Sequence, residues 1–308
     1  MTPRIGLIGC GRWGRLILRD LLASGAQVHV AVPSEATRAR ALAEGATIAV
    51  PDLAQLGLLD GYVVATPTAT HAAVLERLLP RERPLFVEKP MTADLASAER
   101  LARAAAGRLF VMDKWRYHPC IEAMRREIAA GTTGEILAIR GSRWQWAHPH
   151  LDVDALWILA SHELSIVLHL TGGIPPLRDA WPAFAGAPSL GGMARLGGAG
   201  DPEIMIEWGV ASPEYRRRCL VVGRRATLEL RDGHDTRIFA RIGAPAGADA
   251  SERVIEAGGE MPLLAEIRAF LDFVRGTGAP PMSHAADGLL IVRRLSEIEA
   301  VIARRSVG

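Results

Sequence analysis

In the first third of the chain, short apolar runs alternate with segments whose apolar residues recur at helical spacing. The apolar runs predict buried strands over 4–8, 27–32, 46–50, 62–65, 85–87 and 109–112. The helical segments are 12–24, 36–44, 70–79 and 95–106, with a short helical piece near 53–58. Strands that alternate with helices of about 10–15 residues indicate βαβ units. We therefore expect a doubly wound parallel sheet in this part of the chain.

From Pro119 onward the pattern changes. A long alternating stretch over 136–146 predicts a strand, and helices are expected over 120–130 and 156–170. Strand-like pieces separated by turn residues follow over 190–196, 203–210, 216–222, 226–231, 236–240 and 253–255. Helices 263–275 and 284–304 close the chain and could pack back on the first domain. The pattern thus predicts an α/β domain over 1–118 and an α+β domain with an antiparallel sheet over 119–308.

Composition narrows the class of protein. Of 308 residues, 49% are apolar and 23% charged, which suits a chain with a sizeable core. No apolar run approaches the ~20 residues that cross a bilayer, and a strand follows Met1 almost at once, so we expect neither a membrane span nor a signal peptide. A net charge of +2 without a Lys/Arg block argues against nucleic-acid binding. The scattered Cys10, Cys120 and Cys219 fit neither a disulfide framework nor a zinc site, so a soluble, reduced, cytoplasmic protein is predicted.

Lysine is rare in this chain. Only two of the 36 Lys and Arg residues are lysines, Lys89 and Lys114. A bias toward arginine codons explains the excess of arginine. A position that keeps lysine despite such a bias can need a compact ammonium group that exchanges a proton, which a guanidinium does not provide. Both lysines are therefore candidate functional residues.

The first expected strand is followed by the motif Gly9-Cys10-Gly11-Arg12-Trp13-Gly14. It fits the pattern GxGxxG between a strand and a helix, the context in which this pattern binds dinucleotides. Gly9 would permit the tight turn, Gly11 the approach of a pyrophosphate to the backbone, and Gly14 close packing of the helix on the sheet. We expect the whole motif, Arg12 and Trp13 included, to lie at the cofactor. A glycine-rich turn without a ligand is the alternative.

The end of the second strand indicates which dinucleotide binds. NAD sites place an acidic residue about 20 residues after the glycines, where it bonds the adenosine ribose. Here Ser34 occupies that place, followed by Thr37, Arg38 and Arg40. A hydroxyl beside guanidinium groups suits a 2′-phosphate. We therefore predict that NADP is preferred over NAD, although solvent-exposed arginines are the alternative and Glu35 blurs the signal.

Four further motifs follow later elements of the pattern. They are Thr66-Pro67 with His71, Glu88-Lys89-Pro90, Arg116-Tyr117-His118-Pro119 and His162. Together with the glycine motif they resemble the glucose–fructose oxidoreductase/inositol dehydrogenase family, often written Gfo/Idh/MocA. The resemblance covers nearly the whole chain, and Glu88-Lys89-Pro90 at its distance from the glycines is its most specific part.

The resemblance implies hydride transfer between a nicotinamide and a carbonyl or alcohol carbon, usually of a sugar or cyclitol. It implies a second domain with a large open sheet whose outer face often serves oligomerisation, so a homo-dimer or homo-tetramer is expected. By the same resemblance Thr66, Pro67, His71 and Glu88 belong to the cofactor site, and Lys89 touches both cofactor and substrate. An ordinary surface ion pair between Glu88 and Lys89 is the alternative.

Lys89 and His162 are the predicted catalytic residues. An ammonium beside a reacting oxygen can hydrogen-bond it, stabilise developing negative charge and share its proton. Family dehydrogenases commonly carry Asp-x-x-x-His where His162 lies, so the resemblance implies acid–base chemistry for this histidine. The position of that aspartate holds Ile158, and Asp154 lies one turn further back. This departure puts the full proton relay in doubt, and a buried core histidine is the alternative.

Weaker candidates for substrate binding are also present. Lys114 and Arg116 lie at the expected domain junction, where they either bind a substrate anion or fix the interface. Trp144 either stacks on a sugar or packs within the sheet, and Asp154 is included because it precedes the histidine helix. The segment 148–152 contains histidines and an aspartate, but it is loop-like and carries a proline, so no metal is predicted there.

We therefore predict an NAD(P)-dependent dehydrogenase or reductase of a polyhydroxylated small molecule, namely a sugar, a sugar derivative or a cyclitol. A nucleotide-sugar or amino-sugar dehydrogenase of polysaccharide biosynthesis is the alternative among enzymes. A non-catalytic, dinucleotide-sensing regulatory protein is the alternative outside enzymes, and it is motivated by the missing aspartate.

Overall fold

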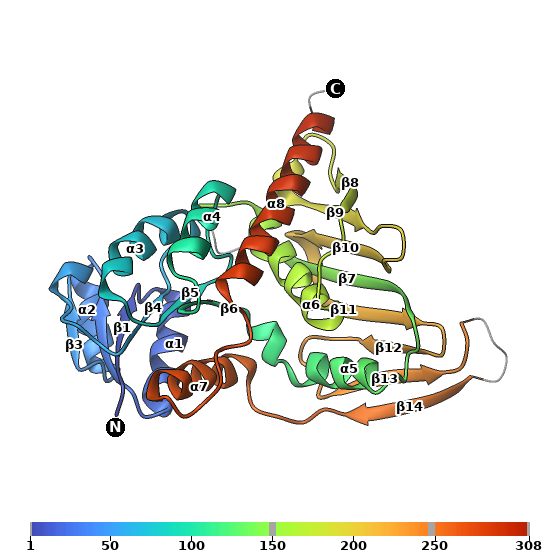
Figure 1. Ribbon diagram of the computed structural model, residues 1–308. Coiled ribbons are helices and arrows are strands. Elements are labelled where there is room, and N and C mark those ends of the chain that lie inside the picture. Colours follow the sequence, from blue (N-terminus) through green and yellow to red (C-terminus); the bar gives the residue numbers. More distant parts are fainter. Residues whose placement is uncertain (1, 148–151, 246–249, 307–308) are drawn as a thin grey trace. The chain divides into compact units, whose positions relative to one another are not determined.

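The computed structural model describes residues 2–147, 152–245 and 250–306, which form two compact units (Figure 1). Unit 1 extends to Lys114 and takes up the chain again over Met261–Val292. Unit 2 comprises Trp115–Glu260 and the chain from Arg293. The domain boundary at 118 remains a prediction, while the compact units divide at Lys114 and give part of the C-terminal chain to unit 1.

Unit 1 contains a six-stranded sheet with the order β3-β2-β1-β4-β5-β6, in which all neighbouring pairs are parallel. The strands are β1 Arg4–Ile8, β2 Gln27–Ala31, β3 Ile48–Val50, β4 Gly61–Val64, β5 Leu85–Glu88 and β6 Leu109–Met112. Every residue of β4, β5 and β6 is buried, as expected for parallel strands covered on both faces. The parallel sheet predicted from the sequence is thus confirmed.

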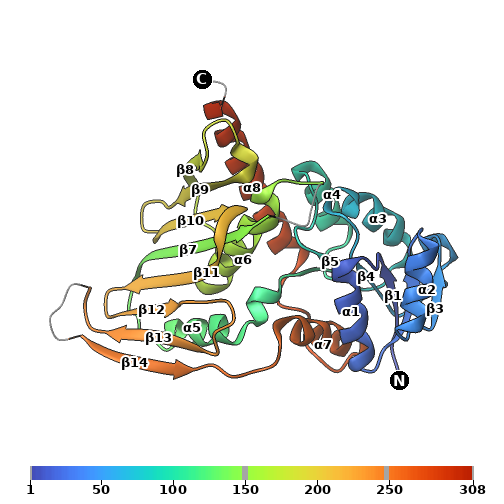
Figure 2. The ribbon, with the colours of Figure 1, turned by 180° about the vertical axis from the view of Figure 1, so that it is seen from behind.

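Helices flank this sheet (Figures 1 and 2). They are α1 Arg12–Ala23, α2 Glu35–Ala43, α3 His71–Leu78, α4 Leu95–Ala104 and α7 Pro262–Arg275. α1 packs against α7, and α3 packs against α4. Leu263, Ile267, Phe270 and Leu271 of α7 share one apolar core with residues of α1 and β1. A helix distant in sequence therefore completes the core of unit 1.

The strand order brings three loops to one edge of this sheet. The chain runs outward from β1 to β2 and β3, then returns to pair β4 with the other side of β1. The loops after β1, β4 and β5 begin at Gly9, Ala65 and Lys89. Because the strands are parallel, these loops share the carboxyl edge of the sheet. Ligands of such sheets bind at this edge, where the strand order reverses.

Unit 2 is built on an eight-stranded sheet with the order β14-β13-β12-β11-β7-β10-β9-β8. β7 and β10 are parallel, and the other neighbouring pairs are antiparallel. The strands are β7 Ile136–Trp146, β8 Leu177–Pro182, β9 Gly191–Leu196, β10 Glu203–Gly209, β11 Ala211–Gly223, β12 Ala226–Leu230, β13 Arg237–Ile242 and β14 Ser251–Glu256. The predicted α+β half with a large, mostly antiparallel open sheet is confirmed.

β8 is a strand that the sequence pattern does not predict. It lies at the edge of the sheet beside β9 and ends at Pro182. Edge strands tolerate proline because one side needs no ladder hydrogen bonds. The segment of β8 can therefore contain a proline and lack regular alternation, which is why the sequence pattern does not reveal it as a strand.

The helices of unit 2 pack on one face of its sheet. They are α5 Pro119–Ala129, α6 Ser161–Thr171 and the part of α8 Ala285–Ser306 that follows Val292. α6 contacts β7, α5 contacts β12 and β13, and a π-helical turn, Leu156–Ala160, precedes α6 and contacts β10. Short 3-10 helices are Leu53–Gln55, Thr68–Thr70, Leu79–Arg81, Lys114–Tyr117 and Pro188–Leu190. Within the described ranges, no helix has both the length and the hydropathy needed to cross a bilayer.

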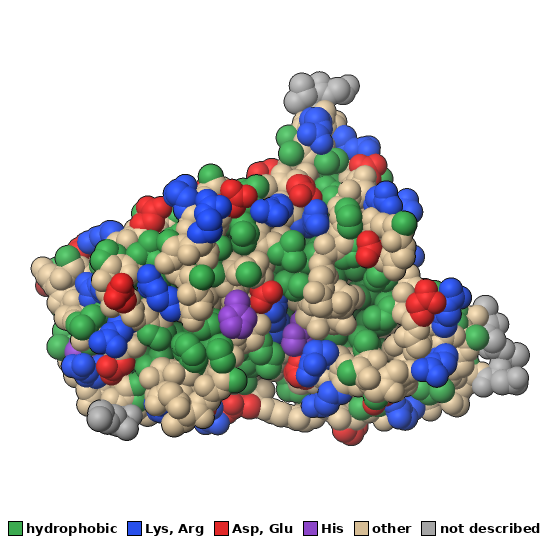
Figure 3. Space-filling view, viewed as in Figure 1, with side chains coloured by type: hydrophobic (Ala, Val, Ile, Leu, Met, Phe, Trp, Pro, Cys, Tyr) green, Lys and Arg blue, Asp and Glu red, His purple; other side chains and the backbone are tan. Residues whose placement is uncertain are grey.

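Charged side chains of both signs are mixed over the face drawn in Figure 3. The described residues also form exposed ion pairs, such as Arg224 with Glu135 and Arg77 with Asp52. Exposed pairs of this kind contribute about 0–1 kcal/mol each. The structural argument below therefore rests on buried charges rather than on these pairs.

Candidate active site

The three glycines after β1 occupy positions with different requirements. Gly9 has a φ of +89°, and a Cβ there would lie 2.5 Å from the carbonyl oxygen of Ala65. A Cβ on Gly14 would lie 2.6 Å from the carbonyl oxygen of Gly9. A Cβ on Gly11 would meet nothing within 4 Å, so the loop is open on that side. A dinucleotide-binding motif needs a tight turn, a close approach of the helix and an open side for the ligand. Gly9, Gly14 and Gly11 provide these in turn.

The N-terminus of α1 is suited to a phosphate group. Gly11 is its N-cap and makes no side-chain capping hydrogen bond, and the first turn carries no acidic residue. Backbone N–H groups and the helix dipole at such an end favour an anion. Arg12 is exposed in the same turn. The residues present therefore fit the pyrophosphate of a dinucleotide.

Ser34 and Arg38 shape the turn after β2. The Oγ of Ser34 accepts a hydrogen bond from the backbone N–H of Thr37 at 3.3 Å, which caps α2. The guanidinium of Arg38 donates to the carbonyl oxygen of Val32 at 3.1 Å and to that of Pro33. Ser34 is exposed and Arg38 is half-buried. Both residues thus hold the turn where the adenosine ribose is expected, and Arg38 already has backbone partners.

His71 connects two loops at the sheet edge. Its side chain is 1% exposed, with Nδ1 2.9 Å from the Pro90 carbonyl oxygen and Nε2 2.9 Å from the Thr66 carbonyl oxygen. Carbonyl oxygens only accept hydrogen bonds, so a neutral ring can donate to one of the two. His71 therefore fixes the Thr66-Pro67 turn relative to Pro90 and has little surface with which to touch a cofactor itself.

Glu88, the last residue of β5, anchors the turn that carries Lys89. Its Oε1 accepts a hydrogen bond from the indole N–H of Trp13, and its Oε2 accepts one from the backbone N–H of Lys89 at 3.1 Å. Burial raises the pKa of Glu88, while Lys89, the Trp13 hydrogen bond and Lys114 act against this rise. Glu88 is 8% exposed, so this arrangement differs from the surface ion pair considered above.

The second lysine lies at the same edge. Nζ of Lys114 is 4.4 Å from the centroid of the Trp13 ring, a cation–π distance. Lys114 also lies close enough to Glu88 to lower the pKa of that carboxyl group. Glu88 and Trp13 therefore connect both lysines with the glycine loop.

Two acidic residues of this edge escape sequence reasoning. Asp113 directly follows β6, and Glu266 lies on α7; each is 1% exposed. A signal for Glu266 exists in the sequence, because it interrupts an apolar face that includes Leu263 and Ile267. A carboxyl group on such a face is unusual and marks a position with a specific partner or task.

His162 lies at the start of α6, directly after the π-helical turn. The residue is half-buried, and its ring lies at a steep angle to that of Trp115, with ring centroids 6.5 Å apart and planes at 62°. π-helical turns inside helices often occur at functional sites. Ile158, at the position of the family aspartate, is buried within this turn. The structure therefore gives His162 an aromatic neighbour at its ring edge.

Asp154 caps the helix that carries His162. Its Oδ1 accepts hydrogen bonds from the backbone N–H groups of Leu156 at 3.0 Å and Trp157 at 3.4 Å. Side-chain oxygens of aspartate commonly satisfy the first donors of a helix in this way. Asp154 therefore stabilises the start of the helical segment that leads to His162, and its role in substrate binding remains a prediction.

A buried ion pair lies directly next to His162 in sequence. Arg143 on β7 donates from Nε to Oε1 of Glu163 at 2.6 Å, and both side chains are 3% exposed. The Arg143 guanidinium also lies 4.4 Å from the Trp115 ring centroid. Sequence reasoning does not find this pair, although Gly141 is a signal. A Cβ at Gly141 would lie 2.4 Å from Glu163 Oε2, so the strand keeps this site clear for the carboxylate.

Two more arginines are buried in unit 2. Arg116 is 4% exposed, and its Nε donates to the hydroxyl of Ser165, on α6, at 3.2 Å. Arg217 is 5% exposed and donates to the carbonyl oxygen of Trp144 at 2.7 Å. Burial, followed by the charge of Arg143, lowers the pKa of Arg217 to about 10. Arginine thus concentrates around α6 and β7.

Trp144 packs within the sheet of unit 2. A Cβ on Gly209 of β10 would lie 2.1 Å from Cζ3 of Trp144, so the ring covers that glycine. The ring also meets Phe184 edge-on, with centroids 6.3 Å apart. These contacts favour the packing interpretation of Trp144 over a sugar platform.

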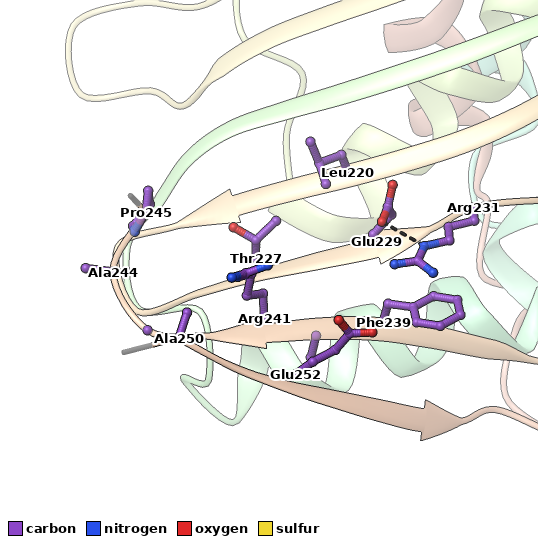
Figure 4. Close-up of a pocket in the computed structure, with 12 residues that line it drawn as sticks. Leu220, Thr227, Glu229, Arg231, Phe239, Arg241, Ala244, Pro245, Ala250 and Glu252 are labelled. Atoms are coloured by element: carbon purple, nitrogen blue, oxygen red, sulfur yellow. Dashed lines mark hydrogen bonds and ion pairs between the residues drawn. The ribbon is translucent and has the colours of Figure 1, made fainter. Parts of the chain in front are cut away.

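Figure 4 shows a groove on the face of this sheet that α5 leaves uncovered. Thr227, Glu229, Arg231, Phe239 and Arg241 are among the residues that line it. Arg231 donates to Glu229 at 3.0 Å, and its guanidinium lies 3.5 Å from the Phe239 ring centroid. The groove contains none of the predicted site residues, so it is separate from the candidate active site.

His148 and His150, in the segment where the sequence predicts no metal site, fall outside the described residues. Across the ranges that are described, no group of three or more His, Cys, Asp and Glu side chains could hold a metal ion. Cys10, Cys120 and Cys219 are all buried and free.

Known proteins resemble this chain in sequence. Residues 3–111 match the model of the GFO_IDH_MocA oxidoreductase family with an NAD-binding Rossmann fold. Inositol 2-dehydrogenase of Renibacterium salmoninarum is 34% identical over 44% of this chain and 44% of its own length. UDP-N-acetylglucosamine 3-dehydrogenase of Acidithiobacillus ferrooxidans is 32% identical over 56% of this chain and 55% of its own. The matched region thus spans about half the length of these relatives. Inositol 2-dehydrogenase of Leifsonia xyli is 27% identical over 96% of this chain and 94% of its own.

Solved structures share the complete fold. The Acidithiobacillus ferrooxidans UDP-N-acetylglucosamine 3-dehydrogenase has a TM-score of 0.87 at 23% identity, with 99% of both chains covered. Levoglucosan dehydrogenase in complex with NADH and levoglucosan has a TM-score of 0.86 at 16% identity, covering 99% of this chain and 98% of that one. The glycine loop, the Glu88-Lys89 turn and these similarities agree: residues 3–111, which lie in unit 1, match the NAD-binding Rossmann domain of the Gfo/Idh/MocA oxidoreductase family.

Proposed function

We propose that this protein is an NAD(P)-dependent oxidoreductase that transfers a hydride between nicotinamide and a carbonyl or alcohol carbon of a sugar, a sugar derivative or a cyclitol. The observation that carries the proposal is the meeting of the Gly9 loop, the Thr66 turn and Lys89 at one edge of a parallel sheet. The names of the relatives, which are dehydrogenases of inositol, UDP-N-acetylglucosamine and levoglucosan, support a polyhydroxylated small-molecule substrate.

Lys89 acts on the reacting oxygen of the substrate in this proposal. The nicotinamide, when bound, accepts or supplies the hydride. The Lys89 ammonium hydrogen-bonds the oxygen and stabilises the negative charge that develops on it. Glu88 keeps the Lys89 backbone in place through the 3.1 Å hydrogen bond from its N–H. Trp13, which donates to the same carboxyl group, ties the lysine turn to the glycine loop.

His162 exchanges the proton. An alcohol that gives up a hydride also loses its hydroxyl proton, so a base must receive it, and in the reverse direction an acid must return it. Histidine changes its charge near neutral pH, which suits both tasks. Its place after a π-helical turn and its half-buried side chain, which is not sealed in the core, support the assignment. With Ile158 at the position of the family aspartate, contact with Trp115 takes part in orienting the ring.

We further propose that NADP is preferred over NAD. The absence of an acid at the tip of β2, the exposed hydroxyl of Ser34 and the nearby guanidinium of Arg38 support this preference. The hydrogen bonds of Arg38 to Val32 and Pro33 would hold its charge beside the ribose. Titration of the protein with NADPH and NADH measures the two dissociation constants, and tighter binding of NADH would contradict the preference.

A nucleotide-sugar dehydrogenase is the second candidate function. It is favoured by the buried arginines of unit 2, since guanidinium groups pair with phosphate. Arg116 bonds the helix that carries His162, and Arg217 lies near Arg143. Turnover of a UDP-sugar with a KM at least about tenfold below that of the matching free sugar, a gain of about 1.4 kcal/mol, would select this candidate.

Homo-dimer or homo-tetramer formation through the uncovered face or edges of the unit 2 sheet is also proposed. Large apolar side chains are exposed on its strands, including Trp146 at 73% and Tyr215 at 50%. These two side chains lie on the neighbouring strands β7 and β11, and contiguous exposed apolar patches are typical of interfaces. Sedimentation velocity of the purified protein measures the mass, and a monomer would contradict this proposal. Cytoplasmic localisation is likewise proposed and is tested by cell fractionation.

One experiment separates the enzyme from a dinucleotide sensor. The protein is first saturated with NADP, and stopped-flow absorbance then follows its reduction by a panel of cyclitols, sugars and UDP-sugars. We expect reduction by at least one polyol. Tight cofactor binding without reduction by any polyol, and without oxidation of NADPH by the corresponding ketones, would favour the non-catalytic alternative.

A further inference from the structure

The ring of Trp115 joins several groups of unit 2 around His162. Trp115 is 6% exposed. The guanidinium of Arg143 lies 4.4 Å from the centroid of its ring, and the ring of His118 stacks on it with centroids 4.9 Å apart and planes at 11°. The ring of His162 meets it at a steep angle, with centroids 6.5 Å apart. These separations are typical of cation–π and aromatic contacts. Trp115 therefore links the predicted acid–base residue to a buried cation.

The surroundings of Trp115 leave its ring little freedom. Nδ1 of His118 accepts a hydrogen bond from the backbone N–H of Cys120 at 3.2 Å, so Nε2 carries the proton and donates to the carbonyl oxygen of Gly233 at 3.1 Å. A Cβ on Gly233 would lie 2.9 Å from Cη2 of Trp115. The stacked His118 ring is thus held at both nitrogens, and the glycine leaves room for the indole. Close packing of this kind keeps a side chain in one rotamer.

Arg143 reaches both the backbone and the ring of the His162 region. Its Nε donates to Oε1 of Glu163 at 2.6 Å, and both side chains are 3% exposed. Glu163 directly follows His162 on α6, while Arg143 lies on β7. The same guanidinium covers Trp115, which meets the ring of His162. A planar guanidinium can donate in its plane and stack through its face, whereas an ammonium group has no such face. One arginine therefore contacts both neighbours of the histidine.

Packing alone does not account for a tryptophan at position 115. Its indole N–H is buried and has no hydrogen-bond partner among the described residues. A buried donor without a partner costs stability, and buried tryptophans usually find one. Phenylalanine or leucine would avoid this cost. Tryptophan is, however, the aromatic residue that binds a cation most strongly. The choice of residue therefore fits the contact with Arg143 better than it fits a purely apolar core.

We propose that Arg143 and Trp115 are positioning residues of His162, which hold its backbone through Glu163 and its ring through the indole. Ile158 occupies the place where family dehydrogenases carry an aspartate, and its apolar side chain can offer the histidine ring no hydrogen bond. The inference rests on the proposed function in one respect, since it takes His162 as the residue that exchanges the proton. A ring held in one orientation keeps its nitrogen at the reacting oxygen, and this alignment contributes to kcat.

Two substitutions of Trp115 test the ring contact. Trp115→Leu removes the aromatic face and should lower kcat by about tenfold to a hundredfold with little change in KM, because misplacing a catalytic group has effects of this size. Trp115→Phe keeps a ring beside Arg143 and His162 and should retain most of kcat. Trp181→Leu is the matched control, since Trp181 lies on the edge strand β8 with the guanidinium of Arg305 5.3 Å from its ring centroid. We expect this control to have the kcat of wild type.

Arg143→Lys tests the guanidinium. An ammonium group can still pair with Glu163, so the buried carboxylate keeps a counter-charge, but it cannot cover Trp115 with a planar face. We expect kcat to fall by about tenfold with KM little changed. Arg231→Lys is the matched control, because Arg231 likewise donates to a glutamate, at 3.0 Å, and lies 3.5 Å from the centroid of the Phe239 ring. It lies in the separate groove, so its substitution should leave kcat unchanged.

The orientation of His162 has a readout that needs neither cofactor nor turnover. NMR spectra of the whole protein with labelled histidine contain its ring signals, which are assigned by their loss in His162→Gln. A neighbouring indole shifts such signals through its ring current. Trp115→Leu and Arg143→Lys should therefore move the His162 signals. The two control variants, at Trp181 and Arg231, should leave them in place.

Several results would overturn the inference. Unchanged His162 signals in Trp115→Leu and Arg143→Lys would show that neither residue orients the ring. Shifted signals with the kcat of wild type would show a contact without a positioning role. A raised KM with unchanged signals would assign Trp115 to substrate contact instead. If Trp115→Leu does not fold, Arg143→Lys and its control still decide. If no polyol is oxidised by any protein while the signals move as expected, the proposed function fails and the orienting contacts stand.

Discussion

The two units balance buried charge in opposite ways. At the cofactor edge of unit 1, both lysines of the chain lie among the three carboxyl groups of Glu88, Asp113 and Glu266. Around α6 and β7 of unit 2, the buried cations are arginines, and the buried acid paired with them is Glu163. The first group consists of lysines and carboxyl groups, which can gain or lose a proton. The second consists mainly of arginines, which stay positively charged.

This difference follows from the chemistry of the two cations. Lysine can change its protonation in a protein and arginine hardly does, while the planar guanidinium binds several acceptors at once. Arg217, for example, donates to two backbone carbonyl oxygens, those of Trp144 and Arg216. The comparison suggests that unit 1 supplies the groups whose charge must respond to the reaction. Under the proposed function, unit 2 would supply rigid positive charge for substrate oxygens or anions.

Breaking the fixed pair of unit 2 should give the largest effect. Arg143→Met leaves Glu163 buried without its cation and should reduce the free energy of unfolding by about 3–5 kcal/mol. The control is Arg224→Met, which removes an exposed pair with Glu135 and should cost at most about 1 kcal/mol. Urea unfolding of both variants measures the difference. Equal losses would mean that burial of the Arg143 pair has no energetic consequence.

In unit 1, the ammonium group of Lys89 should matter mainly for turnover. Lys89→Met should lower kcat by at least about a hundredfold, because it removes the group that polarises the reacting oxygen. Lys114→Met is the matched control, and we expect it to change cofactor affinity more than kcat. Steady-state kinetics with the best substrate, together with circular dichroism of both variants, make the comparison. Near-normal turnover of Lys89→Met would remove the lysine from the mechanism.

The pH dependence of stability sharpens the contrast further. The pKa of Glu266 is raised by folding, so the folded protein binds the proton more tightly than the unfolded chain does. Stability must therefore fall as the pH rises above the ordinary carboxyl range. The fall is at most about 1.4 kcal/mol per pH unit from this group and continues until the folded pKa is passed. Unfolding free energies from pH 4 to 9 on wild type and Glu266→Gln should diverge in this sense; parallel curves would contradict it.

The smallest effect is expected at the turn after β2. Ser34→Asp places a carboxylate where a 2′-phosphate would lie and should shift the preference from NADP toward NAD by about tenfold. The ratio of dissociation constants for NADPH and NADH, from fluorescence titration, measures the shift. Ser34→Ala is the control for loss of the α2 cap, which should affect both cofactors alike. An unchanged ratio of the two dissociation constants in Ser34→Asp would mean that the adenosine ribose does not bind beside Ser34.

Much of the site was accessible from the sequence because it is built from local motifs. Gly9 and Gly14 mark positions where a side chain cannot fit, and those positions are fixed by the turn between one strand and one helix. Lys89 follows the strand that its motif predicts. Ser34 is the N-cap of α2 and Arg38 lies in that helix, and their hydrogen bonds to the backbone do not follow from the sequence pattern.

Other residues depend on partners that no local pattern encodes. Glu163 on α6 meets Arg143 on β7, a pairing that the helical spacing around His162 does not indicate. The ring of His71 bonds two loops that are separated in sequence, and the motif that contains it does not show this. Glu266 joins the edge because α7 returns to unit 1 near the end of the chain. Periodicity indicates which face of a helix is buried and not which residues that face meets.

The sequence by itself determined the order of strands and helices apart from β8, the glycine turn and the identity of the rare lysines. These features depend on backbone geometry and residue type within a few neighbouring positions. The tertiary structure alone decided which charges share a buried region: Lys114 with Trp13, Glu266 with Glu88, and Arg143 with Glu163. The physical reason is that protonation and pairing of buried groups are set by distance and desolvation in space, and neither follows from separation along the chain.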